Sequence, residues 1–509
     1  MFVDITQAMG QVVTPMMLLL IIVGVIAGMA VGATPGLSAT VGLALLLPIT
    51  FAMDPTTGLV LMGAFYMGAI YGGSFTAILV NTPGTPSSIA TTFDGYPMTQ
   101  QGRSEAAIIA STVGSVVGGV IGVIGLLVLA PLLAQVVLAF GPQEYFWMGI
   151  FGLTMIAGIA PSLVKGLAAG FLGLLISTIG ISPVGGEVRF TFGFTQMQGG
   201  IPLIVALIGL FTIPTIVDMV IAPGSRTAAM AADAQARQRG GELKSTLRDL
   251  LSRPLNPIRS SIIGTFVGIL PGAGGSVANL IAYNEAKRTS KRSKNFGKGE
   301  IDGVVAPEAA NNAVVGGGMV PLLTLGIPGA PPDAVIYGVL LLHGLRPGPD
   351  LFEEQGVLTF TFILAVGVSA ILMAPVGLVA GRGLQRAVVR TPTHYLAPLI
   401  ALLTIVGSYA VRNSALDVLM MVALGLIGYG LRNVGLPPAA IVLGVVLGPI
   451  IETGLAQGLL TATAQANPWT SFFTRPISLV LIVLVILGLA WPLITDLREK
   501  RKAGKVKAP

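Results

Sequence analysis

Runs of about 20 apolar residues recur along the whole chain, and they restrict its fold more than any other feature. A run of this length is what an α-helix needs to cross the hydrocarbon core of a bilayer. Only 10% of the 509 residues are charged, against roughly 25% in an average soluble domain. This composition excludes a soluble enzyme, a disordered chain and a nucleic-acid-binding protein. It predicts an all-α polytopic membrane protein in contact with membrane lipid.

The apolar runs fall into two predicted halves, residues 1–223 and 261–495. A basic linker, 224–260, separates the halves, and a basic tail, 496–509, follows them; we expect both on the cytoplasmic side, with the linker forming an amphipathic surface helix. The runs lie near 12–33, 37–53, 57–80, 104–139, 144–160, 162–181, 200–222, 261–284, 304–326, 333–345, 357–381, 394–411, 414–431, 436–451 and 477–495.

Two short patterns in the first half recur in the second. Gly28–Gly36 aligns with Gly264–Gly272 at an offset of 236, with identical residues at five of nine positions. A second pattern, Gly72-Gly73 followed by Pro83–Pro86, recurs at an offset of 245 as Gly317-Gly318 followed by Pro328–Pro331. Chance is the alternative in a chain rich in Gly and Pro, but the patterns keep their order and spacing. We therefore predict an internal repeat.

The charges around these patterns predict that the repeat is inverted. The first 102 residues contain no Lys or Arg, whereas Arg253 and Arg259 precede segment 261–284 and Lys287 and Arg288 follow it. Positive-inside bias places both ends of that segment in the cytoplasm. The segment would then be a re-entrant hairpin broken at its centre, with arms of about 15 Å that reach the bilayer midplane. A single kinked span is the alternative.

The Gly-Pro breaks predict the binding site of a transporter. Backbone groups freed at membrane depth must face protein or a water-filled cavity, and broken segments in matching positions of two halves mark such sites. The alternative is that small residues simply allow close helix packing. The candidate residues of the first half are Pro35, Gly36, Ser38, Thr40, Asn81, Thr82, Pro83, Gly84, Thr85, Ser87 and Ser88. Those of the second half are Pro271, Gly272, Gly274, Gly275, Ser276, Asn279, Asn311, Asn312, Gly326, Pro328 and Gly329.

The breaks also predict an anionic substrate and a coupling cation. Each break starts a half-helix whose first N–H groups carry partial positive charge and suit a carboxylate. Glu308, Thr324 and Asp333 are the candidates for ion coupling by Na⁺ or H⁺. Alternatively, Glu308 is an acid favoured at a helix start after Pro307, and Asp333 caps the next helix.

The sequence does not support a metal site, a cofactor or enzyme chemistry. The chain has no Cys and two His, His343 and His394, so we expect no metal site and no cofactor. Standard enzyme motifs and a nucleotide-binding loop are missing. We therefore expect transport driven by an ion gradient, with a passive channel or a membrane-embedded enzyme acting on an acidic or lipidic substrate as alternatives.

The motifs resemble those of the large membrane subunit of the tripartite tricarboxylate transporters. The resemblance rests on six stretches: Gly32–Thr40, Tyr71–Ser88, Gly268–Gly275, Pro307–Asn312, Leu322–Gly329 and Leu342–Gly348. It implies a bacterial inner-membrane protein with about 12 membrane segments. It also implies a small four-helix membrane subunit and a periplasmic solute-binding protein as partners, and uptake of carboxylates such as citrate coupled to Na⁺ or H⁺.

Overall fold

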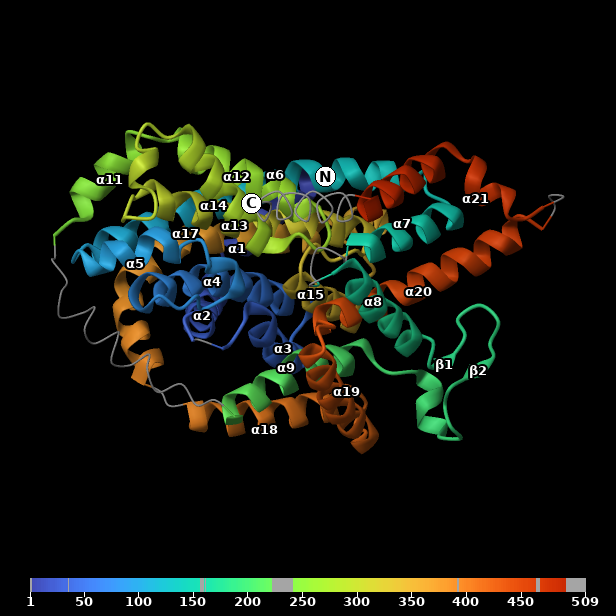
Figure 1. Cartoon of the computed structure of the whole chain (residues 1–509). Coiled ribbons are helices and arrows are strands. Elements are labelled where there is room, and N and C mark those ends of the chain that lie inside the picture. Colours follow the sequence, from blue (N-terminus) through green and yellow to red (C-terminus); the bar gives the residue numbers. More distant parts are fainter. Residues whose placement is uncertain are drawn as a thin grey trace, which may run out of the picture. The chain divides into compact units, whose positions relative to one another are not determined.

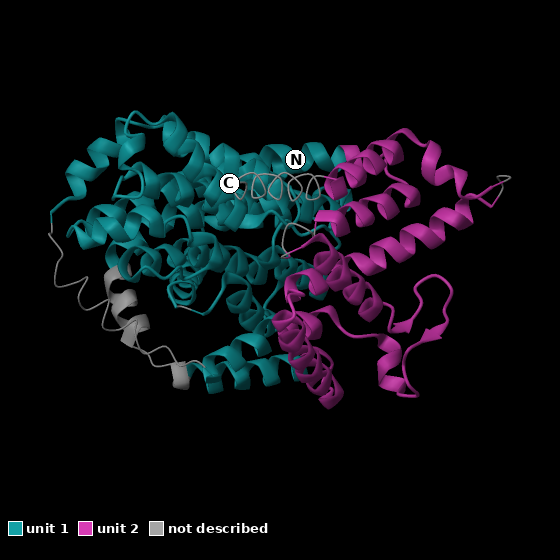
Figure 2. Ribbon diagram, viewed as in Figure 1, with its two compact units in different colours: residues 1–135, 211–410 teal, residues 136–210, 411–509 magenta. Residues whose placement is uncertain are grey.

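The computed structural model describes residues 2–34, 36–155, 160, 162–221, 241–390, 393–463 and 467–490. Most of these residues are helical (Figure 1). The chain forms two compact units, one of residues 1–135 and 211–410 and the other of residues 136–210 and 411–509 (Figure 2). Each unit takes residues from both halves that the sequence predicts, and the division into two halves remains a prediction.

The first unit contains every candidate site residue. Three helices have residues in both units, namely α6 (Ser104–Val137), α9 (Leu203–Ile221) and α18 (Thr393–Arg412). Its other elements are α1 (Phe2–Val12), α2 (Pro15–Gly32), α3 (Ala39–Thr50), α4 (Pro55–Val80), η1 (Pro86–Ser88), α5 (Thr92–Gln100), α11 (Leu243–Leu251), α12 (Leu255–Ile269), α13 (Gly274–Thr289), η4 (Ser293–Asn295), α14 (Asp302–Leu325), α15 (Pro331–Leu342), α16 (Pro349–Glu353) and α17 (Gly356–Arg390).

Helices α4 and α14 form the centre of this unit. Every residue of α4 from Gly58 onward is buried, and so is every residue of α14 except the last. Helix α2 packs along α4, and α12 packs along α14.

Glycines bring each of these helix pairs into backbone contact. A Cβ added at Gly28 of α2 would overlap the carbonyl oxygen of Phe65, and one added at Gly264 of α12 would overlap that of Ala310. The two contacts join equivalent positions, because Gly28 and Gly264 differ by 236 and Phe65 and Ala310 by 245. Small residues permit such close approach. The two helix pairs thus pack through the same positions of the predicted repeat.

The helices are interrupted where the sequence has its Gly-Pro patterns. Helix α2 ends at Gly32 and α3 begins at Ala39, while α12 ends at Ile269 and α13 begins at Gly274. Ser38 starts α3 as its N-cap, because its Oγ accepts a hydrogen bond from the N–H of Val41 at 3.2 Å. Pro35 lies outside the described residues.

The buried central helices end in the same way. Asn81 follows α4 with φ of 54°, and Gly326 follows α14 with φ of 70°. A residue in this left-handed conformation ends a helix, and Gly and Asn adopt it most readily. The two positions differ by 245, the offset of the second sequence pattern. Asn81 therefore has a structural role as the C-cap of α4.

A loop of the second half holds one carboxylate of the first. The fully buried Asp94 of α5 accepts hydrogen bonds from the N–H groups of Gly297, Gly299 and Glu300, at 2.8 to 2.9 Å. The hydroxyl of Tyr283 donates a fourth, at 2.9 Å. Successive backbone N–H groups of this kind form an anion-binding nest.

The predicted linker is helical in the part that the structure describes. Helix α11 buries Thr246 and Leu250 and is followed closely by α12. Residues 224–240 of the linker, and the whole basic tail 496–509, lie outside the described residues.

The second unit is also mainly helical. Two ion pairs join its elements. Arg475 pairs with Glu144 at 2.7 Å, and Arg412 pairs with Asp417 at 2.6 Å. Its elements are α7 (Pro142–Met155), α8 (Leu163–Ser177), β1 (Gly180–Ile181), β2 (Val188–Arg189), η3 (Thr195–Gly199), α19 (Ala415–Asn433), α20 (Pro438–Thr461) and α21 (Thr470–Thr474). The two strands pair antiparallel.

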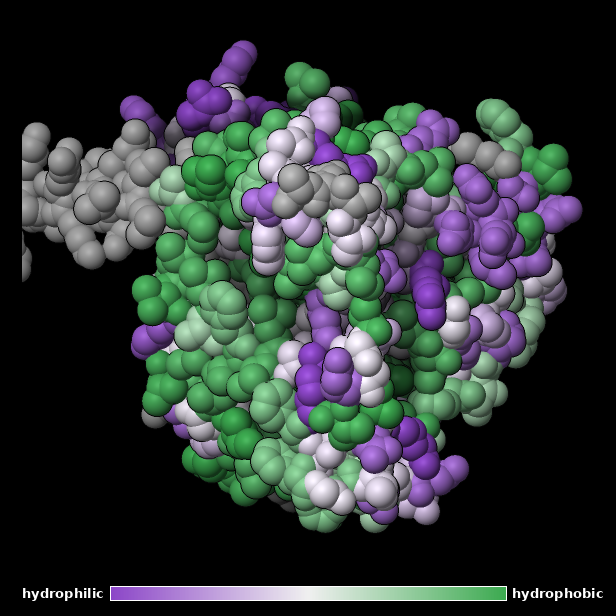
Figure 3. Space-filling view, turned by 90° about the vertical axis from the view of Figure 1, so that its right-hand side faces the viewer, coloured by the Kyte–Doolittle hydropathy of each residue, from purple (hydrophilic) through white to green (hydrophobic). Residues whose placement is uncertain are grey.

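Seven helices of the described chain are long and apolar enough to cross a membrane. They lie at Pro15–Gly32, Pro55–Val80, Ser104–Val137, Leu203–Ile221, Gly356–Val379, Ala415–Asn433 and Pro438–Thr461. Shorter apolar helices lie at Ala39–Thr50, Leu163–Ser177, Pro331–Leu342, Leu396–Arg412 and Pro476–Ala490. On the face shown in Figure 3, hydrophobic residues cover broad continuous areas. The fold is all-α, as the sequence predicts, and the number of about 12 membrane segments stays a prediction.

Candidate functional site

The interruptions of the second half lie against each other. The N–H of Gly272, between α12 and α13, donates to the carbonyl of Gly329, between α14 and α15, at 2.9 Å. A Cβ added at Gly329 would come within 2.6 Å of the carbonyl oxygen of Gly268. In the first half, a Cβ added at Gly84 would overlap the carbonyl oxygen of Gly32, which is the equivalent pair. In both halves, glycine lets the two interruptions meet.

The interruptions of the two halves also meet. The Asn279 amide of α13 donates a hydrogen bond to the carbonyl of Ser87 in η1. A Cβ added at Gly275 would overlap Oδ1 of Asn311 and come within 2.8 Å of the Ser87 Cβ. The first turns of α13, the middle of α14 and η1 thus converge on one place. Helix α15 of the second half correspondingly packs against α3 and α4 of the first.

Asn311 has unsatisfied hydrogen-bonding capacity at this place. Its side chain is 1% exposed, and neither Nδ2 nor Oδ1 has a hydrogen-bond partner among the described residues. Oδ1 of the fully buried Asn279 likewise has no partner there. Leaving a buried polar group unsatisfied costs about 1–3 kcal/mol, so such groups call for a ligand, a water or a functional role. The amides of Asn279 and Asn311 are therefore the strongest candidates for direct ligand contact.

A buried carboxylate lies one turn before Asn311 on α14. Glu308 is fully buried, and the hydroxyl of Thr91 donates a hydrogen bond to its Oε1. The hydroxyl of Ser115, on α6, donates to its Oε2 at 3.3 Å. In the part of the chain that the structure describes, no Lys, Arg or His pairs with Glu308. A carboxylate buried without a cation either takes up a proton or binds a metal cation.

Further hydroxyls continue this polar cluster along α6 and α4. Ser111 donates to the hydroxyl of Ser74 at 2.7 Å, and Ser74 donates to the Tyr71 carbonyl at 2.8 Å. All of these hydroxyl groups are buried. The sequence analysis missed Thr91, Ser111 and Ser115. Ser111 and Ser115 lie one turn apart in an apolar helix, and this spacing could have indicated a polar face.

The other two predicted ion-coupling residues have partners on their own elements. Oδ2 of Asp333 accepts a hydrogen bond from the N–H of Ala330 at 2.7 Å, so Asp333 closes the start of α15. The Thr324 hydroxyl donates to the carbonyl of Val320 one turn earlier, at 2.7 Å. Because Pro331 and Pro332 have no N–H, α15 also offers fewer donors to an anion than a helix start normally does.

The remaining candidates lie around the convergence with varied exposure. Thr85 lies within hydrogen-bond distance of Ser87 and Ser88, at 3.1 and 3.0 Å. The Asn312 amide donates to the carbonyl of Met67 at 3.3 Å. The buried candidates are Thr40, Gly84, Pro271, Gly272, Gly326, Pro328 and Gly329; Ser38, Pro83, Gly274, Gly275 and Ser276 are half-buried, and Gly36, Asn81 and Thr82 are exposed.

Paired interrupted helices, buried amides and a carboxylate that has no countercharge among the described residues are features typical of a membrane transport protein. A comparison with known protein families identifies the family of the chain. The model of the tripartite tricarboxylate transporter TctA family matches residues 18–443. The chain belongs to this family and is a multi-pass membrane transporter, not an enzyme.

Two curated proteins of Agrobacterium vitis are similar to the chain. One, described as "Uncharacterized 52.8 kDa protein in TAR-I ttuC' 3'region", is 35% identical over 489 residues, which cover 96% of this chain and 95% of that protein. The other, "Uncharacterized protein in TAR-II ttuC' 3'region", is 36% identical over 238 residues, which cover 47% of this chain and 97% of that protein. No solved structure matches the chain.

Proposed function

We propose that the chain imports organic acid anions, tri- or dicarboxylates such as citrate, by secondary active transport coupled to Na⁺ or H⁺. The unpartnered buried amide of Asn311 carries the proposal, because it lies where interruptions of both halves converge. The substrate carboxylates bind there to side-chain amides and hydroxyls and to the N–H groups at the start of α13. Helix starts carry partial positive charge, so an anion can be held without a buried Arg.

The coupling cation binds at Glu308 in this proposal. Thr91 and Ser115 supply two hydroxyl oxygens beside the carboxylate, and such oxygens serve a proton or a Na⁺ ion equally well. Glu308 and Asn311 lie three residues apart on α14, which places them on neighbouring positions of one face. Occupancy of the cation site therefore affects the helix that carries the substrate amide. Thr324 and Asp333 act as supporting residues of the adjoining helix ends.

The transporter lies in the bacterial inner membrane and works with two partner proteins. These are a small four-helix membrane subunit and a periplasmic solute-binding protein that delivers the substrate. Membership of a tripartite family supports this part of the proposal. The C-terminus is cytoplasmic, because the basic tail follows the positive-inside bias.

The two halves are inverted repeats that alternate access to the site. The equivalent glycine contacts on α4 and α14 support the repeat, and the distribution of Lys and Arg supports its inversion. In this mechanism the hairpins around the interruptions move relative to the flanking helices. The chain has no Cys, so introduced cysteine pairs that lock a hairpin to a flanking helix would be its only thiols. Unchanged uptake after cross-linking would contradict the movement.

Reconstitution with both partners tests the function. Uptake of labelled citrate into proteoliposomes should follow an imposed Na⁺ or pH gradient and should disappear when the gradient is removed. A passive channel would give uptake that follows the citrate gradient alone. A membrane-embedded enzyme would release a modified product, which mass spectrometry of the vesicle contents would detect.

A further inference from the structure

A basic pocket opens where α12 begins and α13 ends, away from the convergence of the interruptions. Its volume is about 520 Å³. Four basic side chains line it, those of Arg253, Arg259, Lys291 and Arg292, and one acidic side chain, that of Asp302. The lining therefore has three more basic than acidic side chains, four minus one, while the carboxylates of Asp249, Glu285 and Glu300 lie outside the lining and within 4.0 Å of its arginines.

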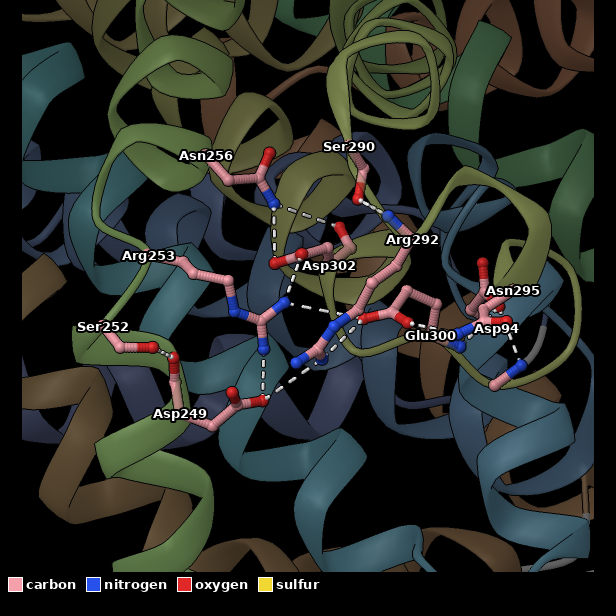
Figure 4. Close-up of polar contacts among 11 residues, drawn as sticks. Asp94, Asp249, Ser252, Arg253, Asn256, Ser290, Arg292, Asn295, Glu300 and Asp302 are labelled. Atoms are coloured by element: carbon pink, nitrogen blue, oxygen red, sulfur yellow. Dashed lines mark hydrogen bonds and ion pairs between the residues drawn. The ribbon is translucent and has the colours of Figure 1, made fainter.

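One of these cations, Arg253, already forms ion pairs within the protein. The guanidinium group of Arg253 forms ion pairs with Asp302 and Asp249, and it lies 3.6 Å from Glu300 (Figure 4). Asn256 donates to Oδ1 of the same Asp302 at 3.2 Å. This network ties α11, α12 and α14 together. Arg253 is thus a structural residue of the pocket wall.

The other three cations keep donors for a ligand. Arg259 approaches Glu285 only to 3.8 Å, and Arg292 approaches Glu300 to 3.6 Å and Asp249 to 4.0 Å. These distances exceed those of charge-assisted hydrogen bonds, about 2.7–2.9 Å. Lys291 is exposed and forms no ion pair with any described residue. Arg259, Lys291 and Arg292 can therefore donate to an anion that enters between them.

An exposed apolar row runs along α12 from the same place. Leu255, Ile258, Ile262 and Phe266 are spaced by three or four residues, so they share one face of the helix. They are 79%, 40%, 46% and 61% exposed, respectively. A contiguous apolar face of this kind on a membrane protein suits lipid acyl chains. The 15 residues of α12 extend about 22 Å, enough to follow an acyl chain through one leaflet.

We propose that this pocket binds the headgroup of an anionic phospholipid. The phosphate oxygens accept hydrogen bonds from Arg259, Lys291 and Arg292, and an acyl chain lies along the apolar row of α12. The pocket is on the face that positive-inside bias assigns to the cytoplasm, where basic residues attract anionic lipids. This site is distinct from the proposed substrate and cation sites.

Native mass spectrometry of the purified full-length chain tests the proposal. The protein is titrated with phosphatidylglycerol and with phosphatidylcholine of the same acyl chains. We expect tighter retention of phosphatidylglycerol, and a loss of about fivefold for each basic side chain removed. The variants are Arg259→Gln and Lys291→Gln, and the matched control is Lys287→Gln, an exposed cation on α13 that does not line the pocket.

Each result decides the question. Equal retention of the two lipids, or unchanged phosphatidylglycerol binding by Lys291→Gln, would overturn the proposal. Lys291→Gln decides even if Arg259→Gln fails to fold, because Lys291 is an exposed residue. Displacement of the lipid by millimolar inorganic phosphate would assign the pocket to a free anion instead. A photo-crosslinker at Ile258 should capture lipid in native membranes, and capture of a protein subunit would refute the lipid site.

Discussion

The Thr91 hydroxyl donates a hydrogen bond to the carboxylate of Glu308 across 217 residues of sequence. The bond joins the segment before α5 to the centre of α14, which carries the unpartnered amide of Asn311 one turn later. A buried carboxylate whose hydrogen-bond partners in the described structure are hydroxyls responds strongly to a bound cation. Several outcomes can be expected from this arrangement and its surroundings.

Replacing Glu308 should uncouple transport from the ion gradient. In Glu308→Gln the site keeps its shape but loses its charge, so uptake with an imposed Na⁺ or pH gradient should fall to the level without a gradient. Thr91→Val removes one hydrogen bond to a charged group, worth about 1.5–3 kcal/mol, and should weaken cation dependence about tenfold or more. The measurement is citrate uptake into proteoliposomes against cation concentration.

The adjacent threonine supplies the control for this pair. Thr92 directs its hydroxyl to the carbonyl of Ile89, at 2.6 Å, and is half-buried. Thr92→Val should leave the cation dependence of uptake unchanged. If Glu308→Gln kept full gradient coupling, the proposed cation site would be wrong.

Removing the Asn311 amide should harm uptake without harming the fold. Asn311→Ala deletes a buried polar group that has no partner among the described residues, so the unfolding temperature should stay the same or rise. Substrate affinity should fall by about tenfold or more, the effect of losing one or two ligand hydrogen bonds of about 1 kcal/mol or more each. Uptake kinetics give the affinity, and a thermal unfolding scan gives the stability. The exposed Asn433, changed to Ala at the end of α19, is the control. A large stability loss in Asn311→Ala with normal affinity would assign Asn311 a packing role.

The glycine contacts of the two helix pairs should be equally sensitive to an added methyl group. Gly28→Ala and Gly264→Ala each place a Cβ on a backbone carbonyl of the central helix. Overpacking of this kind costs about 1–3 kcal/mol, and thermal unfolding in detergent should reveal it in both variants. Gly10→Ala in α1 is the control, because an added Cβ there meets no atom within 4 Å. That variant should be neutral or slightly stabilised, since Ala favours a helix over Gly by about 0.5–1 kcal/mol. Tolerance of both Gly28→Ala and Gly264→Ala would contradict the close packing.

The start of α4 should show a pH-dependent contribution from Asp54. Partial burial opposes the effect, but hydrogen bonds from the Thr57 hydroxyl and from the N–H groups of Thr57 and Thr56 lower the pKa of Asp54. A lowered pKa in the folded state means that the stabilisation is present above the unfolded pKa, about 3.9. It is lost as the pH falls through the lower folded value.

A capping substitution measures this contribution. At pH 7, Asp54→Ala should cost about 1 kcal/mol, the usual value of an N-cap, whereas Asp54→Asn should keep most of the stability. The difference between Asp54→Ala and the parent should shrink as the pH falls below about 4. Thermal unfolding at a series of pH values provides the measurement. A difference that is constant over this range would exclude the charge of Asp54 as its source.

The places where helices break could be predicted from the sequence, because the cause of each break is local. Gly and Pro at positions 32–36, 81–86, 271–275 and 326–331 interrupt helices through their own backbone restrictions, and the structure breaks at each place. The C-cap role of Asn81 was equally local. Asn tolerates positive φ and precedes Thr-Pro-Gly, which a helix cannot continue through.

The partners of Glu308 and Asp94 could not be predicted, because they depend on tertiary packing. Thr91 and Ser115 are separated from Glu308 by 217 and 193 residues, and threonine and serine are common in membrane helices for packing reasons alone. The nest around Asp94 is formed by backbone N–H groups, which leave no pattern in side-chain identity. The basic residues Lys287 and Arg288 predict only that this end of segment 261–284 lies in the cytoplasm, and they carry no information on the main-chain N–H groups that bind Asp94.

The hydrogen bonds of Asp94 also join the two predicted halves at one particular place. Asp94 joins the first predicted half to the second through four hydrogen bonds, three from N–H groups of the loop after η4 and one from the Tyr283 hydroxyl of α13. A movement that separates α5 from this loop must break all of these hydrogen bonds at the same time. If the two halves move as proposed, an opening at this place costs these four hydrogen bonds and an opening elsewhere does not, so the inward-facing and outward-facing forms would differ in free energy.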